Sequence, residues 1–423
     1  MKTVTIIGLG YVGLPLALLT AERGYKTYGI DIDKKIVDLT NKGISHIKDP
    51  DLEKSLKKQK GKIIATTDVK VIKNSDIVII CVPTPVDKTL HPDLNPIKGA
   101  SHSISKNLKK GHLIIIESSI NPGVTEEVVQ PILEESGLKA GKDFYLVHCP
   151  ERIDPGNKKW TIKNIPRVVG GINRESTKIA AEFYRSIIDA EILKLSSVKA
   201  AEATKIVENA FRDVNIAFVN ELAKSFDNLG IDITEVIKAA STKPFAFMPH
   251  YPGAGVGGHC IPVDPYYLIE RARQSGFSHK FLSLAREIND SMPFYTVERT
   301  IKALNEIGKS VKGTKICILG ISYKKDVTDL RESPALKVID LLKKLGANLE
   351  LYDPFVPEKS TLKSLNDCLK CECLVLVTDH SEFRNIDYNK LKKSKVKAIV
   401  DGRNCLDRDK IKSFEIIYKG IGR

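Results

Sequence analysis

The residues best suited to covalent chemistry in this 423-residue chain lie in the stretch GAGVGGHCIPVDPYYL, residues 253–268. Cys260 directly follows a glycine-rich loop, and Asp264 stands four positions later. A cysteine attacks as its thiolate. The residues after it, with Pro265 in the first turn, are typical of the start of a helix, whose positive dipole end stabilises an anion. From spacing alone, Asp264 is either the N-cap of that helix or a catalytic group.

Other polar residues could complete a site around this thiol. The loop glycines at 253, 255, 257 and 258 allow a ligand to press against the main chain, or they make an ordinary surface loop. Lys205 and Asn209 are one helical turn apart and share a face, and Glu151 follows a Cys-Pro pair after an apolar run. Such residues occur equally on solvated surfaces and in turns, so only the fold can bring them into one site.

A second constellation is the pattern GLGYVG at residues 8–13, which follows an apolar run and opens a helical stretch. Gly8 permits a tight turn, Gly10 lets a pyrophosphate approach the backbone, and Gly13 lets the helix pack on the strand. Asp31 ends the next strand-like run, where a carboxylate accepts from ribose hydroxyls and repels a 2′-phosphate. The pattern predicts binding of NAD rather than NADP.

Composition and charge exclude several classes of protein. The net charge is +14, but the lysines are scattered without aromatic residues between them, so we expect no nucleic-acid partner. Apolar runs such as 76–82 and 112–120 are too short to span a bilayer. The chain begins with a strand-like run, which leaves no room for a signal peptide. We therefore expect a cytoplasmic protein with reduced thiols and no membrane association.

Most of the eight cysteines have a structural interpretation. Cys81 and Cys317 lie within apolar runs and are predicted to be buried. The cluster CLKCEC, residues 368–373, resembles a metal knuckle but lacks a second pair of ligands at zinc spacing. We interpret it as a surface helix followed by the start of a strand, and we expect no metal.

The organisation of the chain predicts an α/β fold. Strand-like runs alternate with helical patterns, as in parallel βαβ units; they cover residues 3–8, 27–31, 76–82, 112–117 and 143–148. Residues 198–229 contain no Gly or Pro and carry apolar residues at helical spacing, which predicts one long helix.

A second alternating region begins near residue 314 with the runs KICILG, LELYD, CLVLVTD and VKAIVDG. Its opening, residues 316–326, keeps the first glycine of a dinucleotide loop but not the second and third. We therefore expect two Rossmann-like doubly wound domains, 1–197 and 306–423, joined by a central helical segment, 198–305, with one long helix.

Eight separated motifs resemble the NAD-dependent UDP-sugar 6-dehydrogenases, the UDP-glucose/GDP-mannose dehydrogenase family. They are GLGYVGLPLA, VPTP, ESSINPG, CPERIDPGN, EATKIVENAFRDVNIAFVNELA, GVGGHCIPVDPYYL, SYKKDVTDLRESPA and VDGRN. The resemblance extends over essentially the whole chain. The segment STKPFAFMPHYPGAGVGGHCIPVDP is most similar to the branch that acts on UDP-N-acetylhexosamines, particularly UDP-N-acetylglucosamine.

The resemblance implies a four-electron oxidation in which NAD is used twice. A primary 6-hydroxyl becomes an aldehyde, which the cysteine matched by Cys260 captures as a thiohemiacetal; a second oxidation gives a thioester, which water hydrolyses. Asp264 would assist proton removal through water, and Lys205 and Asn209 would hold the developing oxyanion. Glu151 would orient or activate the attacking water.

The same resemblance implies further contacts and an assembly. Cofactor-binding residues would be Gly8, Gly10, Tyr11, Val12, Gly13, Asp31, Thr84, Ser119 and Arg331. Substrate-binding residues would be Glu151, Arg152, Lys205, Asn209, Tyr251, Gly257, Cys260, Lys324 and Arg403. Many members have threonine at the position of Ser119, which is also expected to contact the catalytic water. The central segment would form a homodimer, the first domain would bind NAD and the last would bind the UDP-sugar.

Alternatives to UDP-N-acetylglucosamine remain open within and outside this class. UDP-N-acetylmannosamine, UDP-N-acetylgalactosamine and UDP-glucose are rival substrates, and the segment 244–257 would discriminate among them. A nonenzymatic nucleotide-sugar or dinucleotide sensor would keep the fold but has no need of the reactive groups. A single-step dehydrogenase of the hydroxyacid type would leave the thiol unexplained.

Overall fold

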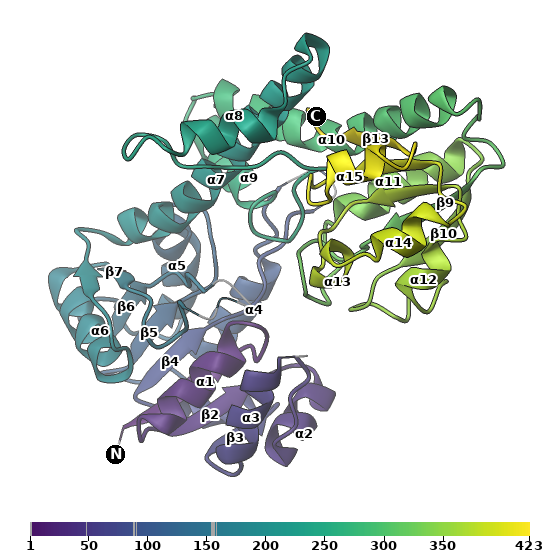
Figure 1. Ribbon diagram of the computed structural model, residues 1–423. Coiled ribbons are helices and arrows are strands. Elements are labelled where there is room, and N and C mark those ends of the chain that lie inside the picture. Colours follow the sequence, from purple (N-terminus) through teal and green to yellow (C-terminus); the bar gives the residue numbers. More distant parts are fainter. Residues whose placement is uncertain (1, 48, 88, 90, 154–156, 158) are drawn as a thin grey trace. The chain divides into compact units, whose positions relative to one another are not determined.

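The computed structural model describes residues 2–47, 49–87, 89, 91–153, 157 and 159–423, which form two compact units (Figure 1). The first unit comprises Met1–Glu208 and Tyr266–Ser278, and the second comprises Asn209–Pro265 and His279–Arg423. Two of the boundaries between the units fall inside helices, α7 (Val198–Leu229) and α9 (Asp264–Gln274), and the third lies between Ser278 and His279. The division of the chain into three domains stays a prediction.

The first unit is built on one twisted sheet. Its strands are β1 (Thr3–Ile7), β2 (Lys26–Ile30), β3 (Ile63–Thr66), β4 (Ile77–Ile80), β5 (Leu113–Ile116), β6 (Tyr145–His148), β7 (Arg167–Gly171) and β8 (Ile192–Lys194). Within the described residues these eight strands follow the order β3-β2-β1-β4-β5-β6-β7-β8. Neighbours are parallel except for β6 and β7, which are antiparallel.

Helices cover both faces of this sheet. They are α1 (Gly13–Glu22), α2 (Lys34–Lys42), α3 (Pro50–Lys58), η1 (Val69–Asn74), α4 (Asn95–Ser105), η2 (Thr125–Val129), α5 (Gln130–Glu134) and α6 (Arg174–Ile187). Alternate residues of a strand point to opposite faces. Ile77 and Ile79 of β4 accordingly join the core with α1 and α6, whereas Val78 and Ile80 join the core with α4 and α5. Burial on both faces explains why these strands are continuously apolar.

The second unit has its own parallel sheet. The strands are β9 (Lys315–Leu319), β10 (Asn348–Tyr352), β11 (Cys373–Leu376), β12 (Ala398–Asp401) and β13 (Ile417–Gly420), in the order β10-β9-β11-β12-β13. Its helices are α8 (Ile233–Ala240), α10 (Lys280–Glu306), α11 (Pro334–Lys344), α12 (Leu365–Cys368), α13 (Ser381–Arg384), α14 (Tyr388–Lys392) and α15 (Arg408–Lys412). The expected fold of two Rossmann-like sheets and a long central helix is confirmed.

The long helix predicted over residues 198–229 is α7 with the same bounds, because no Gly or Pro interrupts its apolar periodicity. Strands β3, β7, β8 and β13 were absent from the sequence prediction. Strand β8 has only three residues, and β7 ends in two glycines, which weakens the strand signal. The loss of a dinucleotide loop in the second unit stays a prediction. Gly320, the first glycine of that pattern, has φ +86°, and a Cβ there would lie 2.6 Å from Thr378 Cβ.

The cysteine cluster belongs to the core of the second unit. Cys81 and Cys317 are buried as predicted. A short helix and the start of β11 lie here as expected, but Cys368, Cys371 and Cys373 are fully buried in the core, so the expected surface position is wrong. Within the described ranges, no group of three or more His, Cys, Asp or Glu side chains gathers to hold a metal ion.

A buried ion pair joins α7 to α10 in the second unit. Asp213 lies 2.5 Å from Arg286 Nη1 and accepts a hydrogen bond of 2.8 Å from Asn289 Nδ2. Asp213 and Arg286 are both buried, whereas Asp290, which pairs with the same guanidinium, is largely exposed. The buried arginine therefore has one buried carboxylate partner and one exposed carboxylate partner.

We expect Asp213→Asn to lower the stability of the second unit by about 3–5 kcal/mol, because it leaves a buried guanidinium without its internal counterion. The matched variant Asp290→Asn removes an exposed partner of the same arginine and should cost about 1 kcal/mol or less. Chemical denaturation followed by circular dichroism measures both. Equal losses would contradict the distinction between the two carboxylates.

Candidate active site

The glycine loop of the first unit leaves one open face. A Cβ on Gly8, whose φ is +93°, would stand 2.6 Å from the carbonyl oxygen of Cys81, and a Cβ on Gly13 would stand 1.8 Å from the carbonyl oxygen of Gly8. Nothing lies within 4 Å of a Cβ built on Gly10. Two glycines are therefore required by packing and the third faces open space, which fits a pyrophosphate lying against the backbone at the start of α1.

Asp31 lies beside this loop, immediately after β2. Its Oδ2 accepts a hydrogen bond of 2.9 Å from the amide of Leu9, and its Oδ1 accepts one of 2.9 Å from the amide of Asp33. The carboxylate is thus held next to the glycine loop, where NAD would present its ribose. Tyr11 and Val12 lie at the tip of the loop, and Tyr11 is largely exposed.

Thr84 and Ser119 also meet at the carboxyl edge of the first sheet. The Thr84 hydroxyl donates to the carbonyl oxygen of Ser119 over 2.6 Å, and the hydroxyl of Tyr267 donates to the carbonyl oxygen of Thr84. Glu202 of α7 accepts from the amide of Gly123 over 2.6 Å, within the same ESSINPG loop. The structure therefore brings together two of the residues expected to contact the cofactor.

Glu151 is held from both sides just beyond β6. Its Oε1 accepts hydrogen bonds of 2.6 Å from the two backbone amides that follow it, and its Oε2 lies 2.6 Å from Arg167 Nη2. Arg152 pairs with Glu208 over 2.6 Å and donates to the carbonyl of Pro166. Residues 154–156 of the CPERIDPGN motif lie outside the described residues.

A buried group of charges lies behind Glu151. Arg167 is fully buried and is 3.6 Å from Glu117, which accepts from the Tyr184 hydroxyl over 2.5 Å. Burial raises the pKa of Glu117 from 4.5 to about 7 despite the opposing effect of Arg167. Arg167, Glu117 and Tyr184 were missed from the sequence, because strand β7 was not predicted.

The reactive thiol lies in the second unit. Cys260 Sγ is 2.9 Å from Nδ1 of His259, and the cysteine is partly exposed. Helix α9 begins at Asp264 with Pro265 in its first turn, within one residue of the prediction. The side chain of Asp264 accepts a hydrogen bond of 2.5 Å from Asn209 Nδ2. Asp264 therefore bonds to a side chain of α7 as well as standing at the start of α9. His259, the neighbour of the Cys260 sulfur, was not predicted from the sequence.

The loop glycines pack against the chain itself. A Cβ on Gly257 would lie 2.7 Å from Tyr323 Cβ, and one on Gly253 would lie 2.5 Å from Arg403 Nη1. The amide of Gly258 donates to the carbonyl of Arg331 over 3.0 Å. These glycines therefore allow another part of the molecule to approach the main chain closely, as expected. On the side where a Cβ would stand, however, that neighbour is the segment 323–334 or Arg403 rather than a ligand.

The remaining predicted residues divide between the units. Lys205 is half-buried on α7, in the first unit, and Lys324 follows β9 in the second. Arg331 forms a bidentate pair with Asp329, with contacts of 2.6 and 3.0 Å. Tyr251 is 60% exposed, so its ring is accessible to a ligand.

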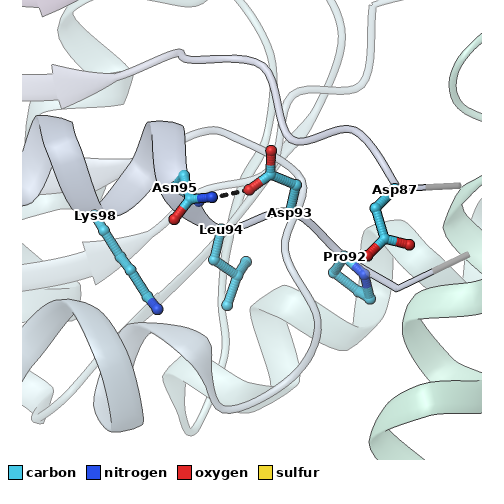
Figure 2. Close-up of a pocket in the computed structure, with 6 residues that line it drawn as sticks. All are labelled: Asp87, Pro92, Asp93, Leu94, Asn95 and Lys98. Carbon is cyan, nitrogen blue, oxygen red and sulfur yellow. Dashed lines mark hydrogen bonds between the residues drawn. The ribbon is translucent and has the colours of Figure 1, made fainter. Parts of the chain in front are cut away.

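A cavity of about 410 Å³ lies where the chain enters α4 (Figure 2). It is lined by Asp87, Pro92, Asp93, Leu94, Asn95 and Lys98. The amide of Asn95 donates to Asp93 Oδ1 over 2.9 Å, as the dashed line shows. None of the predicted site residues lines this cavity, and we assign it no role.

The fold and the glycine loop are those of a dinucleotide-dependent oxidoreductase with a second Rossmann-like sheet, and Cys260 is a partly exposed thiol. Across the part of the chain that the structure describes, we find no helix long and apolar enough to cross a membrane.

Comparison with known proteins places the chain in a family. Sequence models of the UDP-glucose/GDP-mannose dehydrogenase family match its NAD binding domain over residues 2–188, its central domain over 199–291 and its UDP binding domain over 317–408. The chain is 36% identical to the UDP-N-acetyl-D-mannosamine dehydrogenase of Pyrococcus horikoshii, over 99% of both chains. It is also 36% identical to the UDP-N-acetyl-D-glucosamine 6-dehydrogenase of Pseudomonas aeruginosa, over 96% of this chain and 98% of that one.

A solved structure of the UDP-D-ManNAc dehydrogenase from Pyrococcus horikoshii matches with a TM-score of 0.94 at 36% identity, covering 100% of this chain and 99% of that one. The chain therefore belongs to the UDP-glucose/GDP-mannose dehydrogenase family. It is an oxidoreductase of the NAD-dependent UDP-sugar dehydrogenases, as the motifs predicted.

We expect Gly10→Ala to fold normally but to bind NAD about tenfold more weakly, because its methyl group enters the space proposed for the pyrophosphate. Gly13→Ala is the matched control for packing, and its clash with the backbone should cost about 3 kcal/mol of folding stability. Calorimetric NAD titration and thermal unfolding separate the two effects. Unchanged NAD affinity in Gly10→Ala would contradict the placement of the cofactor.

Proposed function

We propose that the protein oxidises the 6-hydroxyl of a UDP-N-acetylhexosamine to a carboxylate. UDP-N-acetylglucosamine is the substrate expected from the sequence. UDP-N-acetylmannosamine is the second candidate, because a relative of equal identity carries that name. The two sugars differ only in configuration at carbon two, and residues 244–257 of the second unit are the segment that we expect to discriminate them.

The overall reaction consumes one UDP-sugar, two NAD⁺ and one water, and releases the uronate, two NADH and three protons. NAD, when bound against the glycine loop, accepts the hydride of each oxidation. The chain's own residues must bind the sugar, hold the aldehyde between the two oxidations and supply water at the end.

The observation that carries this proposal is the partly exposed thiol of Cys260 in an NAD-dependent dehydrogenase. Nδ1 of His259, 2.9 Å from Sγ, is close enough to accept the thiol proton. The sulfur then bonds to the aldehyde carbon as a thiohemiacetal. Loss of hydride from that carbon gives a thioester, and water breaks its C–S bond. A single oxidation of an alcohol would have no use for this sulfur.

Three polar side chains are proposed to act on the oxygen of the reacting carbon. The hydrogen bond between Asn209 and Asp264 holds both groups in fixed positions. Asp264 assists removal of the hydroxyl proton through water, Asn209 donates to the oxygen or water, and the ammonium of Lys205 stabilises the negative charge on the oxygen.

Other residues bind substrate, cofactor or water in this proposal. Glu151 orients and activates the water that attacks the thioester, with Ser119 contacting the same water. The UDP-sugar is bound by Arg152, Tyr251, Gly257, Lys324 and Arg403, and Arg331 reaches the cofactor.

A homodimer is also proposed. The helix α7 presents Val207, Phe211 and Phe218 at spacings that place them on one stripe, and each is about half exposed, at 54%, 50% and 55%. An apolar stripe of this kind is suited to a second copy of the same helix.

The substrate is identified by incubating the purified protein with NAD and each of four UDP-sugars: the N-acetylated gluco, manno and galacto forms, and UDP-glucose. We expect two NADH per sugar consumed, with one N-acetylhexosamine preferred by about tenfold or more because the acetamido group needs a matching partner.

Absorbance at 340 nm and chromatography of the uronate give the ratio. One NADH per sugar would place the end of the reaction at the aldehyde and contradict the thioester. Binding without NADH production from any of the four sugars would support a nucleotide-sugar sensor instead.

A further inference from the structure

The charged group behind Glu151 follows from the register of three strands. In the parallel pairing of β5 and β6, Ile116 lies opposite His148, so the next residue, Glu117, follows at the carboxyl end. In the antiparallel pairing of β6 and β7, His148 lies opposite Gly170. Continuing this register brings Glu151 opposite Arg167, the first residue of β7.

The side chains of this group are removed from water. Arg167 and Tyr184 are fully buried, Glu117 is 1% exposed and Glu151 is 6% exposed. The guanidinium is 2.6 Å from Glu151 and 3.6 Å from Glu117. Its carbon lies 5.9 Å from the centre of the Tyr184 ring, within cation–π range. One arginine thus lies beside two carboxylates, and one of them, Glu151, is the residue proposed to activate water.

A purely structural role explains this arrangement poorly. Burying a pair of opposite charges is often no more stable than an apolar replacement, and a third buried charge adds further cost. Buried charges of this kind gather at functional sites, where they set the orientation and basicity of one group. Glu151 is the member of this group to which the proposed function gives a chemical role, so we take it as the residue on which the others act.

We propose that Arg167, held by Glu117 and Tyr184, is a positioning residue that fixes Glu151 for hydrolysis of the thioester. The inference rests on the proposed function and assigns the buried residues to its last step. In that step Glu151 accepts a proton from water, the water oxygen bonds to the carbonyl carbon, and the C–S bond breaks to release the Cys260 thiolate. No electrons are transferred, so the two oxidations are already complete.

The group also carries a protonation equilibrium. Glu117 is faced by Arg167 from β7, Tyr184 from α6, Glu151 and Cys149 beyond β6, and Cys81 beyond β4. Burial raises the pKa of Glu117 to about 7 and raises the pKa of both thiols well above their ordinary range, so they stay neutral. When Glu117 loses its proton, Arg167 is shared between two carboxylates and a second negative charge faces Glu151.

The first test separates the oxidations from the hydrolysis. In a single turnover with UDP-N-acetylhexosamine, Tyr184→Phe and Arg167→Met should form NADH within about twofold of the wild-type rate but release uronate about tenfold more slowly. Arg167→Lys keeps the charge and should recover part of the release rate. Ser75→Ala is the control for Tyr184→Phe, because it also removes one buried hydroxyl, bonded to Thr5 over 2.5 Å.

We expect Ser75→Ala to lower the melting temperature without changing the ratio of the two rates. Equal slowing of NADH formation and uronate release in a folded Tyr184→Phe or Arg167→Lys protein would overturn the proposal, as would wild-type rates for both. If the wild-type protein forms no NADH from any UDP-sugar, the proposed function itself fails, which is a different result.

The second test needs no substrate. The folded state keeps a proton on Glu117 up to a pH near 7, whereas an ordinary glutamate loses it near 4.5. Stability therefore falls as the pH rises between these values. The Glu117→Gln side chain cannot ionise, so the melting temperature of this variant should rise relative to that of the wild type between pH 5 and pH 8. The rate of uronate release should increase near pH 7 in the wild type but not in the variant. A pH-independent difference in melting temperature would overturn the protonation equilibrium.

Discussion

The functional loops of this protein depend on polar side chains along one face of α7. Buried backbone amides need hydrogen-bond partners. The polar side chains of α7 that form the contacts below are spaced seven, four and seven residues apart, at Glu202, Asn209, Asp213 and Asn220. Glu202 accepts from the amide of Gly123 in the first unit; in the second, Asn209 bonds Asp264, and Asn220 accepts from the amide of Gly253. The same helix therefore bonds to the ESSINPG loop within the first unit and to Gly253 and Asp264 within the second, and Asp213 pairs it with α10.

The second constraint is that other atoms approach the main chain closely at several glycines. These glycines differ in which atoms occupy the space where a Cβ would stand. At Gly13 and Gly257 the neighbour is the chain itself, so these residues serve packing, whereas Gly10 faces open space. The motif GLGYVG thus contains positions that packing restricts to glycine and one position that faces open space. In the loop before Cys260, Tyr323 and Arg403 occupy the space where side chains at Gly257 and Gly253 would stand, so larger residues would clash there.

Local patterns in the sequence were sufficient for much of the fold and part of the site. The helix at 198–229 and the loop at 8–13 were predictable because uninterrupted periodicity and glycine spacing act within a few residues. Arg167 was not, because its role arises from the antiparallel pairing of β7 with β6, and a strand ending in two glycines has a weak signal. The partners of Gly253 and Gly257 lie more than sixty residues away along the chain, beyond the reach of local patterns.

In the proposed reaction Cys260 carries the sugar as a thioester. Rapid acid quench of the wild-type protein during one turnover with UDP-N-acetylhexosamine and NAD, followed by peptide mass spectrometry, tests this directly. We expect a UDP-uronyl group on the peptide that contains Cys260 and none on the peptide with Cys405, the other partly buried thiol. Uronate formation with no acyl group on Cys260 at any quench time would contradict the account.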